Sequence, residues 1–313
     1  MSDARRRGWA EIARRIAFSE GARRVAAFDW ISGRVGSREN PDGMRSLMHA
    51  IVFLALACGV LDAALLWRHA WTRWELFSFL HLAWISAFLV GTVSNVGFLE
   101  TLDGIQLHRL GGPNVLTLTR GLLIPPLIYL IATADFVLAA LLYGLVTGTD
   151  VVDGWWARRF GGQSKLGIVL DPVVDLLVHV SVFTALGLSG ALGLLGLILI
   201  LVRTALLVLG TIVLYLWKGR VRIQPTPLGK GTGLLLTLVT LPFLWLLGCE
   251  APRCAFWVAG LRHFLTALLA LAALHVVAIG IVNLGRPAVA AARPRPLHRR
   301  MIGRPRGRHD DTR

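Results

Sequence analysis

Apolar stretches recur along most of the chain, and short polar segments separate them. A helix needs about 20 predominantly apolar residues to cross the hydrocarbon core of a bilayer. By that measure the sequence predicts eight spanning helices. Six lie at about 46–67, 76–99, 133–158, 164–187, 190–217 and 263–284, and two more begin near Asn114 and Leu228. The pattern therefore predicts an all-α polytopic membrane protein.

Composition and charge support this fold class and suggest an orientation. Of the 313 residues 55% are hydrophobic, as in membrane proteins. The formal net charge of +15 is concentrated in residues 1–45 and 286–313. Under the positive-inside rule, both termini and the loops near 100–113, 158–165 and 218–230 are expected in the cytoplasm. The protein would then lie in the inner (cytoplasmic) membrane.

The two basic ends are expected to act as cytoplasmic anchors that attract anionic lipid headgroups. Neither contains a recognisable nucleic-acid-binding module, so we expect no nucleic-acid partner. Residues 1–45 fit either an amphipathic interfacial helix or a partly disordered basic leader. No uncharged apolar stretch follows the first arginines, so no secretory signal peptide is expected.

Three cysteines and one acid in the apolar segments have simple interpretations. Cys58 is expected to be an inert packing residue. Cys249 and Cys254 flank a loop on the outer side, where an oxidising compartment would permit a disulfide. Asp62 fits three roles: a functional acid, an acid near the end of its helix, or a partner in a hydrogen bond to a neighbouring residue.

Four carboxylates gather near the junction of the fourth and fifth spanning helices. Asp150 and Asp153 are three residues apart, and Asp171 and Asp175 are four apart, so each pair shares one helical face. The short basic connection between the helices predicts antiparallel neighbours, which would bring the four acids together. Carboxylates at membrane depth are costly and usually functional. Their oxygen ligands suit two hard divalent cations, Mg2+ or Mn2+.

Small residues and an arginine accompany these acids. Gly154 and Ala157 follow Asp153 on about the same helical face, and small residues allow close approach of a helix or a flat ligand. Arg158 offers a planar fork that suits phosphate oxygens. Gly167 is expected to allow close helix packing. Together these features indicate a site for a diphosphate.

The spacing D-x2-D-G-x2-A-R-x8-G-x3-D-x3-D resembles the signature of the CDP-alcohol phosphotransferases, and every position is filled. Upstream, N-x-L-T-x-x-R from Asn114 resembles the entrance to the first core helix of that family. Alone, Asn114 would fit a helix cap and Arg120 a snorkelling anchor. The resemblance covers about residues 112–285 and implies a six-helix catalytic core, with 46–99 as an additional transmembrane hairpin.

The resemblance also implies an activity and a set of roles. A lipid phosphate group would pass from a CDP-linked lipid to an alcohol, with release of CMP at the cytoplasmic face, and homodimers are usual in the family. The implied metal ligands are Asp150, Asp153, Asp171 and Asp175, and Asp175 is also the implied base or activator of the alcohol. The implied donor-binding residues are Asn114, Thr117, Gly154, Ala157 and Arg158. The implied acceptor-binding residues are Arg203 and Lys230.

Two local sequence stretches favour one acceptor, but they do not identify it. L-D-P-V-V-D and R-G-L-L-I-P are most similar to phosphatidylglycerophosphate synthases, which implies glycerol 3-phosphate. Those enzymes usually have D-P-V-A-D-K, whereas Leu176 follows Asp175 here, and they have G-K-x-K-T, whereas this chain has G-K-G-T-G. Inositol phosphate or another polyol phosphate stays open.

Two rival classes fit the sequence less well. Intramembrane prenyltransferases of the UbiA type also hold a diphosphate through Mg2+ and aspartates, but their acid clusters lack D-G-x2-A-R. A transporter would favour a repeated architecture with helices broken near the midplane. No internal repeat is visible in this sequence.

Overall fold

The computed structural model describes residues 40–68, 74–101, 105–160, 164–218 and 226–285. At 74, 151, 153–160, 215 and 218 it describes only the backbone. The segments expected at 1–39 and 286–313 lie outside these residues. The domain boundaries predicted from the sequence otherwise stay predictions.

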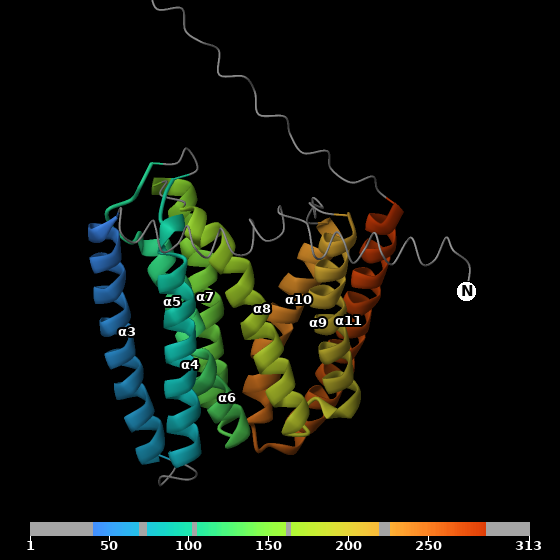
Figure 1. Cartoon of the computed structure of the whole chain (residues 1–313). Helices are drawn as coiled ribbons and strands as arrows, with labels where there is room; N and C mark the ends of the chain where they lie inside the picture. Colours follow the sequence, from blue (N-terminus) through green and yellow to red (C-terminus); the bar gives the residue numbers. More distant parts are fainter. Residues whose placement is uncertain (1–39, 69–73, 102–104, 161–163, 219–225, 286–313) are drawn as a thin grey trace, which may run out of the picture.

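Aligned helices form the whole described structure (Figure 1). Within the described ranges there is no strand, only two isolated bridges that involve the segment before α5. The helices are α3 (Pro41–Arg68), α4 (Trp74–Ser94), the 3-10 turn η1 (Val96–Phe98), α5 (Gly112–Leu122), α6 (Ile124–Ala132), α7 (Phe136–Phe160), α8 (Lys165–Leu188), α9 (Gly193–Lys218), α10 (Pro227–Leu247) and α11 (Pro252–Gly285).

Seven spans in the described part are long and apolar enough to cross a membrane, with α5 and α6 counted as one. This confirms the all-α polytopic membrane fold. Helix α7 is the eighth predicted crossing, and its described apolar part is the shorter stretch Phe136–Asp150. The side chains described without a gap in α7 end at Asp150.

Two predicted boundaries were wrong. Helix α3 begins at Pro41 and α11 at Pro252, both earlier than the apolar pattern suggested. In α11 the charged Arg253 and Arg262 interrupt the apolar pattern without ending the helix. The loop between α10 and α11 is therefore short, and a disulfide joins Cys249 in it to Cys254 in the first turn of α11.

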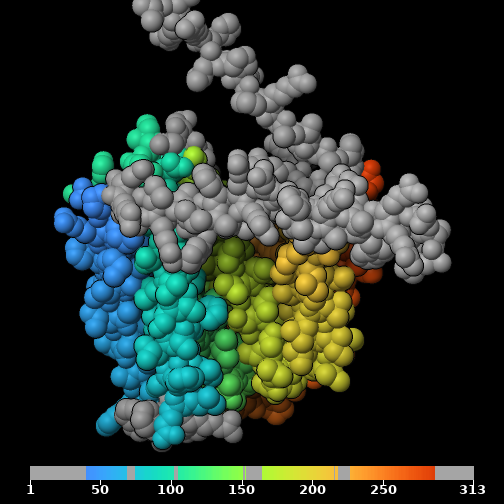
Figure 2. Space-filling model, in the orientation of Figure 1, coloured from blue at the N-terminus to red at the C-terminus, as the bar shows by residue number. Residues whose placement is uncertain are grey.

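The hairpin α3–α4 packs against α5 and α6 at one side of the bundle, and α9, α10 and α11 stand at the other (Figure 1). Figure 2 shows α3 and α4, in blue and cyan, covering the flank of the core helices. Leu65, Leu66 and Phe77 of the hairpin join the same apolar cluster as residues of α6, α7 and α8. The hairpin is thus part of the folded body.

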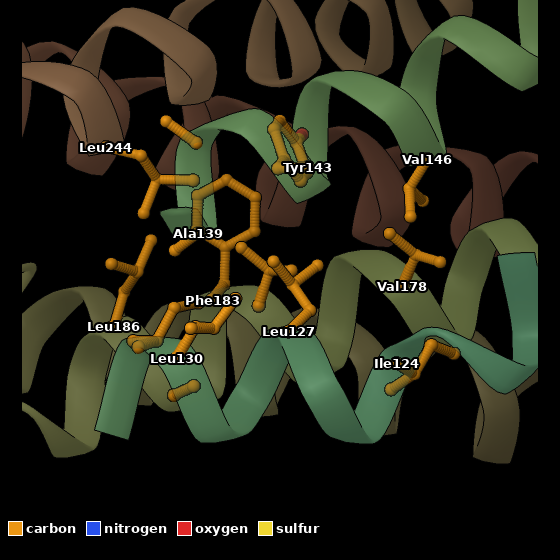
Figure 3. Close-up of a cluster of buried hydrophobic side chains, with 14 of the residues drawn as sticks. Ile124, Leu127, Leu130, Ala139, Tyr143, Val146, Val178, Phe183, Leu186 and Leu244 are labelled. Atoms are coloured by element: carbon orange, nitrogen blue, oxygen red, sulfur yellow. The ribbon is translucent and has the colours of Figure 1, made fainter. Parts of the chain in front are cut away.

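The interior of the core is filled by apolar side chains from α6, α7, α8 and α10. Phe183 lies among Leu127, Leu130 and Leu186, beside Tyr143 of α7 (Figure 3). Phe183 and Leu186 are fully buried. This packing fixes α7 and α8 against α6, so their polar ends have defined positions.

Side-chain caps set the starts of two helices near the site. The Ser164 hydroxyl accepts a hydrogen bond from the Gly167 amide, and the Thr226 hydroxyl accepts one from the Gly229 amide. Such caps satisfy amide groups that a helix start leaves unbonded. They fix where α8 and α10 begin.

Candidate active site

Three of the four predicted acids converge on one arginine. Asp150 lies late in α7, Asp171 and Asp175 lie early in α8, and Arg120 lies in the last turn of α5. Helix α5 packs against both α7 and α8. The acids thus meet across α5, whereas the sequence suggested direct contact between their two helices.

The guanidinium group of Arg120 contacts all three carboxylates. Its Nη1 donates to Oδ1 of Asp150 and, at 2.9 Å, to Oδ1 of Asp175. Its Nη2 lies 3.6 Å from Asp171 Oδ1. The Arg120 side chain is 2% exposed, whereas those of Asp150, Asp171 and Asp175 are 53%, 43% and 44% exposed. A buried cation thus supports a half-exposed layer of carboxylates.

Thr117 orients one of these acids. Its hydroxyl, one turn before Arg120 on α5, bonds to Oδ1 of Asp171 and lies 3.4 Å from Arg120 Nη2. Threonine and arginine thus hold the same carboxylate oxygen. Thr117 is predicted to bind the CDP-linked donor, and in the structure its hydroxyl contacts Asp171.

Asn114 and Gly167 form the tight contact between α5 and α8. Asn114 Nδ2 donates to Ser164 Oγ at 2.8 Å. A Cβ atom on Gly167 would lie 2.5 Å from Asn114 Oδ1, so only glycine allows this approach. This matches the packing role expected for Gly167. Asn114 is not the cap of α5, because Gly111 occupies that position.

Four predicted site residues lie where only the backbone is described. Asp153, Gly154, Ala157 and Arg158 belong to the final turns of α7, and their side chains fall outside the described residues. Their assignments as metal ligand and donor-binding residues stay predictions. Their place on α7 follows directly after Asp150.

The two predicted acceptor residues lie on α9 and α10, away from α5. Arg203 is partly buried in α9, and its buried Nε has no hydrogen-bond partner among the described residues. It lies within electrostatic range of His179 on α8, one turn after Asp175. Lys230 is exposed in the first turn of α10. The structure does not bring these two residues into a described contact.

Sequence reasoning missed the parts played by Arg120 and His179. The snorkelling interpretation of Arg120 was wrong, since its side chain is buried among acids. Several intramembrane acids need a cation nearby, and that requirement was the available signal. His179 Nδ1 lies 2.8 Å from the Asp175 carbonyl oxygen and Nε2 lies 3.1 Å from Thr237 Oγ1, which ties α8 to α10 below the site.

The three described carboxylates offer oxygen ligands and negative charge, which are the properties that a divalent cation site needs. Among residues with described side chains, no three His, Cys, Asp or Glu groups stand at metal-holding spacing. Arg120 lies among three of the predicted ligands. Three half-exposed carboxylates around one guanidinium carry a formal excess of negative charge, which a bound cation would offset. Carboxylate oxygens are the ligands that Mg2+ and Mn2+ prefer. The described acids therefore suit such an ion in ligand type and charge, and its binding here stays a prediction.

Two described cavities lie away from these acids. One, of about 270 Å3, is an apolar groove between α4 and α8 that includes Phe88, Gly91 and Val173. The other, of about 450 Å3, is lined by charged and polar residues, including Arg45 and Arg109, near the start of α3. Neither includes Asp150, Asp171 or Asp175.

Comparison with known proteins gives partial matches to enzymes of phospholipid synthesis. A provisionally named cardiolipin synthase of Mycobacterium tuberculosis is 36% identical over 121 residues, which cover 38% of this chain and 56% of that protein. A CDP-diacylglycerol–glycerol-3-phosphate 3-phosphatidyltransferase of Aquifex aeolicus is 29% identical over 133 residues, 40% of this chain and 71% of that protein. A phosphatidylinositol phosphate synthase of Corynebacterium glutamicum is 39% identical over 75 residues, 24% of this chain and 34% of that protein.

The chain thus spans about half the length of the mycobacterial relative and a third of the corynebacterial one. No solved structure matches it. The model of the CDP-alcohol phosphatidyltransferase family, however, matches residues 111–279, more than half of the chain. That range contains Arg120 and all four aspartates. This integral membrane protein belongs to the CDP-alcohol phosphatidyltransferase family.

Proposed function

We propose that this protein transfers a phosphatidyl group from a CDP-linked lipid, such as CDP-diacylglycerol, to the hydroxyl group of a glycerol-containing phosphate and releases CMP. The observation that carries the proposal is the convergence of Asp150, Asp171 and Asp175 on buried Arg120. In the reaction, the acceptor oxygen bonds to the lipid-linked phosphorus, and the bond from that phosphorus to the CMP oxygen breaks. The acceptor proton must leave as this bond forms.

Two divalent cations, Mg2+ or Mn2+, held by Asp150, Asp153, Asp171 and Asp175, would supply neutralisation of the donor phosphates and of the departing CMP. Arg120 holds the Oδ1 atoms of the three described acids, and their side chains remain about half exposed. Those acids are thus positioned without being covered. Such preorganisation lets a site stabilise charge without rearranging during the reaction.

Asp175 is the proposed proton acceptor. A base must lie within reach of the acceptor hydroxyl, and Asp175 is exposed enough to meet a substrate. Its Oδ1 is held by Arg120, and its main-chain carbonyl by His179. The carboxylate therefore has a fixed direction when the proton arrives.

Donor binding is proposed for the α5 and α7 residues around the acids. Gly154 and Ala157 would border the cytidine, and Arg158 would contact the diphosphate through its planar fork. Asn114 and Thr117 would complete this wall from α5. Thr117 already touches Asp171, which supports its place there.

The acceptor pocket is proposed at Arg203, with Lys230 at its entrance. A partly buried guanidinium with an unbonded Nε needs an anionic partner, and an acceptor phosphate supplies one. We propose glycerol 3-phosphate, the acceptor in the printed name of the Aquifex aeolicus relative. A second candidate is phosphatidylglycerol, because the mycobacterial relative is named for cardiolipin, in which one glycerol carries two phosphatidyl groups. Both acceptors present a glycerol hydroxyl and a phosphate.

The proposed orientation places the site end of the bundle and both termini in the cytoplasm. Most basic residues flank that end in sequence, as the positive-inside rule requires. Soluble phosphates would then reach the aspartates directly. A homodimer is proposed from the family resemblance alone.

CMP release tests the proposal. Purified protein with CDP-diacylglycerol and Mg2+ would be offered glycerol 3-phosphate, phosphatidylglycerol, inositol phosphate, serine or free inositol. We expect CMP release with one of the two glycerol-containing phosphates. Turnover with serine alone would contradict the role of Arg203, and no CMP with any acceptor would contradict the activity.

A further inference from the structure

The backbone is interrupted directly after Arg120. Pro125 and Pro126 lack the amide hydrogens that would normally bond the carbonyls of Gly121 and Leu122, four residues earlier. Helix α5 accordingly ends and α6 begins at this point. Unbonded carbonyls within a membrane span are costly. The break thus leaves two acceptors that need donors from elsewhere.

Helix α4 supplies both donors. Trp84 Nε1 donates to the Gly121 carbonyl at 2.9 Å, and His81 Nε2 lies 3.2 Å from the Leu122 carbonyl. A carbonyl only accepts, so His81 Nε2 carries a hydrogen and donates. The two residues are three positions apart and share one face of α4. Two side chains of the hairpin thus replace the two amides that proline removes.

An acid on helix α3 holds the other ring nitrogen of His81. Asp62 Oδ2 lies 2.6 Å from His81 Nδ1, and the His81 side chain is 1% exposed. A carboxylate on one ring nitrogen sets the orientation of the other. A Cβ atom on Gly121 would collide with the ring of Phe88, so α4 packs directly on the break. Asp62, His81 and Leu122 form one polar link across α3, α4 and α5.

We propose that the hairpin α3–α4 is a positioning element for the active site, and that His81 and Trp84 are its positioning residues. The hairpin precedes residue 111, where the family match begins. By bonding the two carbonyls, it keeps the last turn of α5 closed, and the guanidinium of Arg120 stays on Asp150 and Asp175. The inference rests on the proposed function only for its effect on turnover.

Two single variants test this positioning. Trp84→Phe keeps an aromatic ring but removes the donor, and His81→Leu removes both hydrogen bonds of the histidine. Trp67→Phe is the matched control, because Trp67 on α3 is 78% exposed. Leaving a buried carbonyl unbonded should lower kcat per folded molecule by about tenfold, with KM for the CDP-lipid changed less than about twofold. Trp67→Phe should match the wild type.

Amide hydrogen exchange gives a readout that does not depend on activity. In both hairpin variants, Trp84→Phe and His81→Leu, amide exchange over residues 117–124 should accelerate, whereas amide exchange in α11 should not. A hairpin that serves only as an anchor would lower the melting temperature and leave kcat per folded molecule and local exchange unchanged, which would overturn the proposal. If the wild-type protein releases no CMP, the proposed function fails, and the exchange measurement still decides the positioning.

A double variant tests the polar link itself. In Asp62→Asn with His81→Gln, the asparagine amide donates to the glutamine oxygen, and the glutamine amide donates to Leu122. This pair should return local exchange to the wild-type rate and kcat to within about threefold of wild type, since the donor is restored. A double variant no better than His81→Leu would overturn the role of the His81–Leu122 hydrogen bond.

Discussion

Two arginines lie within the membrane helices on different neighbours of α8, and their surroundings differ. Arg120 on α5 is buried among three carboxylates and Thr117. Arg203 on α9 is partly buried, and no described acid pairs with it. A buried cation must find negative charge in the protein or in a ligand. The contrast teaches that Arg120 finds its negative charge within the protein, whereas for Arg203 we propose that the acceptor phosphate supplies it.

The largest effect is expected when Arg120 loses its charge. Arg120→Leu would leave three carboxylates without their cation. Because these acids are about half exposed, the loss of stability should be smaller than the roughly 3–5 kcal/mol that follows when a fully buried partner is left. Activity and melting temperature should fall together. Arg120→Lys should keep more stability, because it retains the charge, but lose the planar fork that joins the acids. Melting curves in detergent would check both, and a wild-type melting temperature for Arg120→Leu would contradict the assigned role.

Asp171→Asn should separate activity from folding. Arg120 keeps Asp150 and Asp175, so the melting temperature should change little. The reaction loses a charged ligand where phosphate charge must be neutralised, so CMP release should fall by at least about a hundredfold. Asp42→Asn is the control, because Asp42 is an exposed acid on α3. Full activity in Asp171→Asn would end the assignment of this acid.

Arg203→Ala should affect the acceptor alone. Losing one charge-assisted contact to phosphate should raise KM for the phosphorylated acceptor by about tenfold, with KM for the CDP-lipid unchanged. Arg253 on α11 is exposed and provides the matched control, Arg253→Ala. Steady-state kinetics with each substrate varied in turn would measure both constants. An equal rise in both KM values would place Arg203 outside an acceptor pocket.

Gly167→Ala is the smallest change and tests the α5–α8 contact that carries Arg120 to its acids. Its Cβ would press on Asn114 Oδ1, and overpacking of this kind costs about 1–3 kcal/mol. Gly210→Ala, where a Cβ meets nothing within 4 Å, should be neutral or stabilising. Comparing the two melting temperatures isolates the clash. Equal values would show that α5 and α8 can separate freely.

Much of this could be predicted from the sequence because membrane segments impose strong constraints. The eight helical segments followed from apolar length alone, and Asp150, Asp171 and Asp175 followed from their spacing on two consecutive helices. Local patterns failed where tertiary contacts decide. They did not show that α5 lies against both acid-bearing helices, nor that α11 continues past charged residues to Pro252.

The hairpin shows the same limit. The sequence marks Asp62 as an acid in an apolar segment, but its partner His81 lies on another helix. The pair Pro125–Pro126 predicts that two backbone carbonyls lack their helical hydrogen bonds. The nearby sequence does not identify the side chains that donate to them. Contacts between helices distant in sequence supply that information.

The most direct test of the central claim is a Mn2+ binding titration of the purified protein with CDP-diacylglycerol, followed by electron paramagnetic resonance. The account predicts about two bound ions per chain, as in two-metal phosphoryl-transfer sites. It also predicts that Asp171→Asn loses binding while Arg203→Ala retains it. Wild-type protein that binds no Mn2+, or an Asp171→Asn variant that binds as the wild type does, would contradict it.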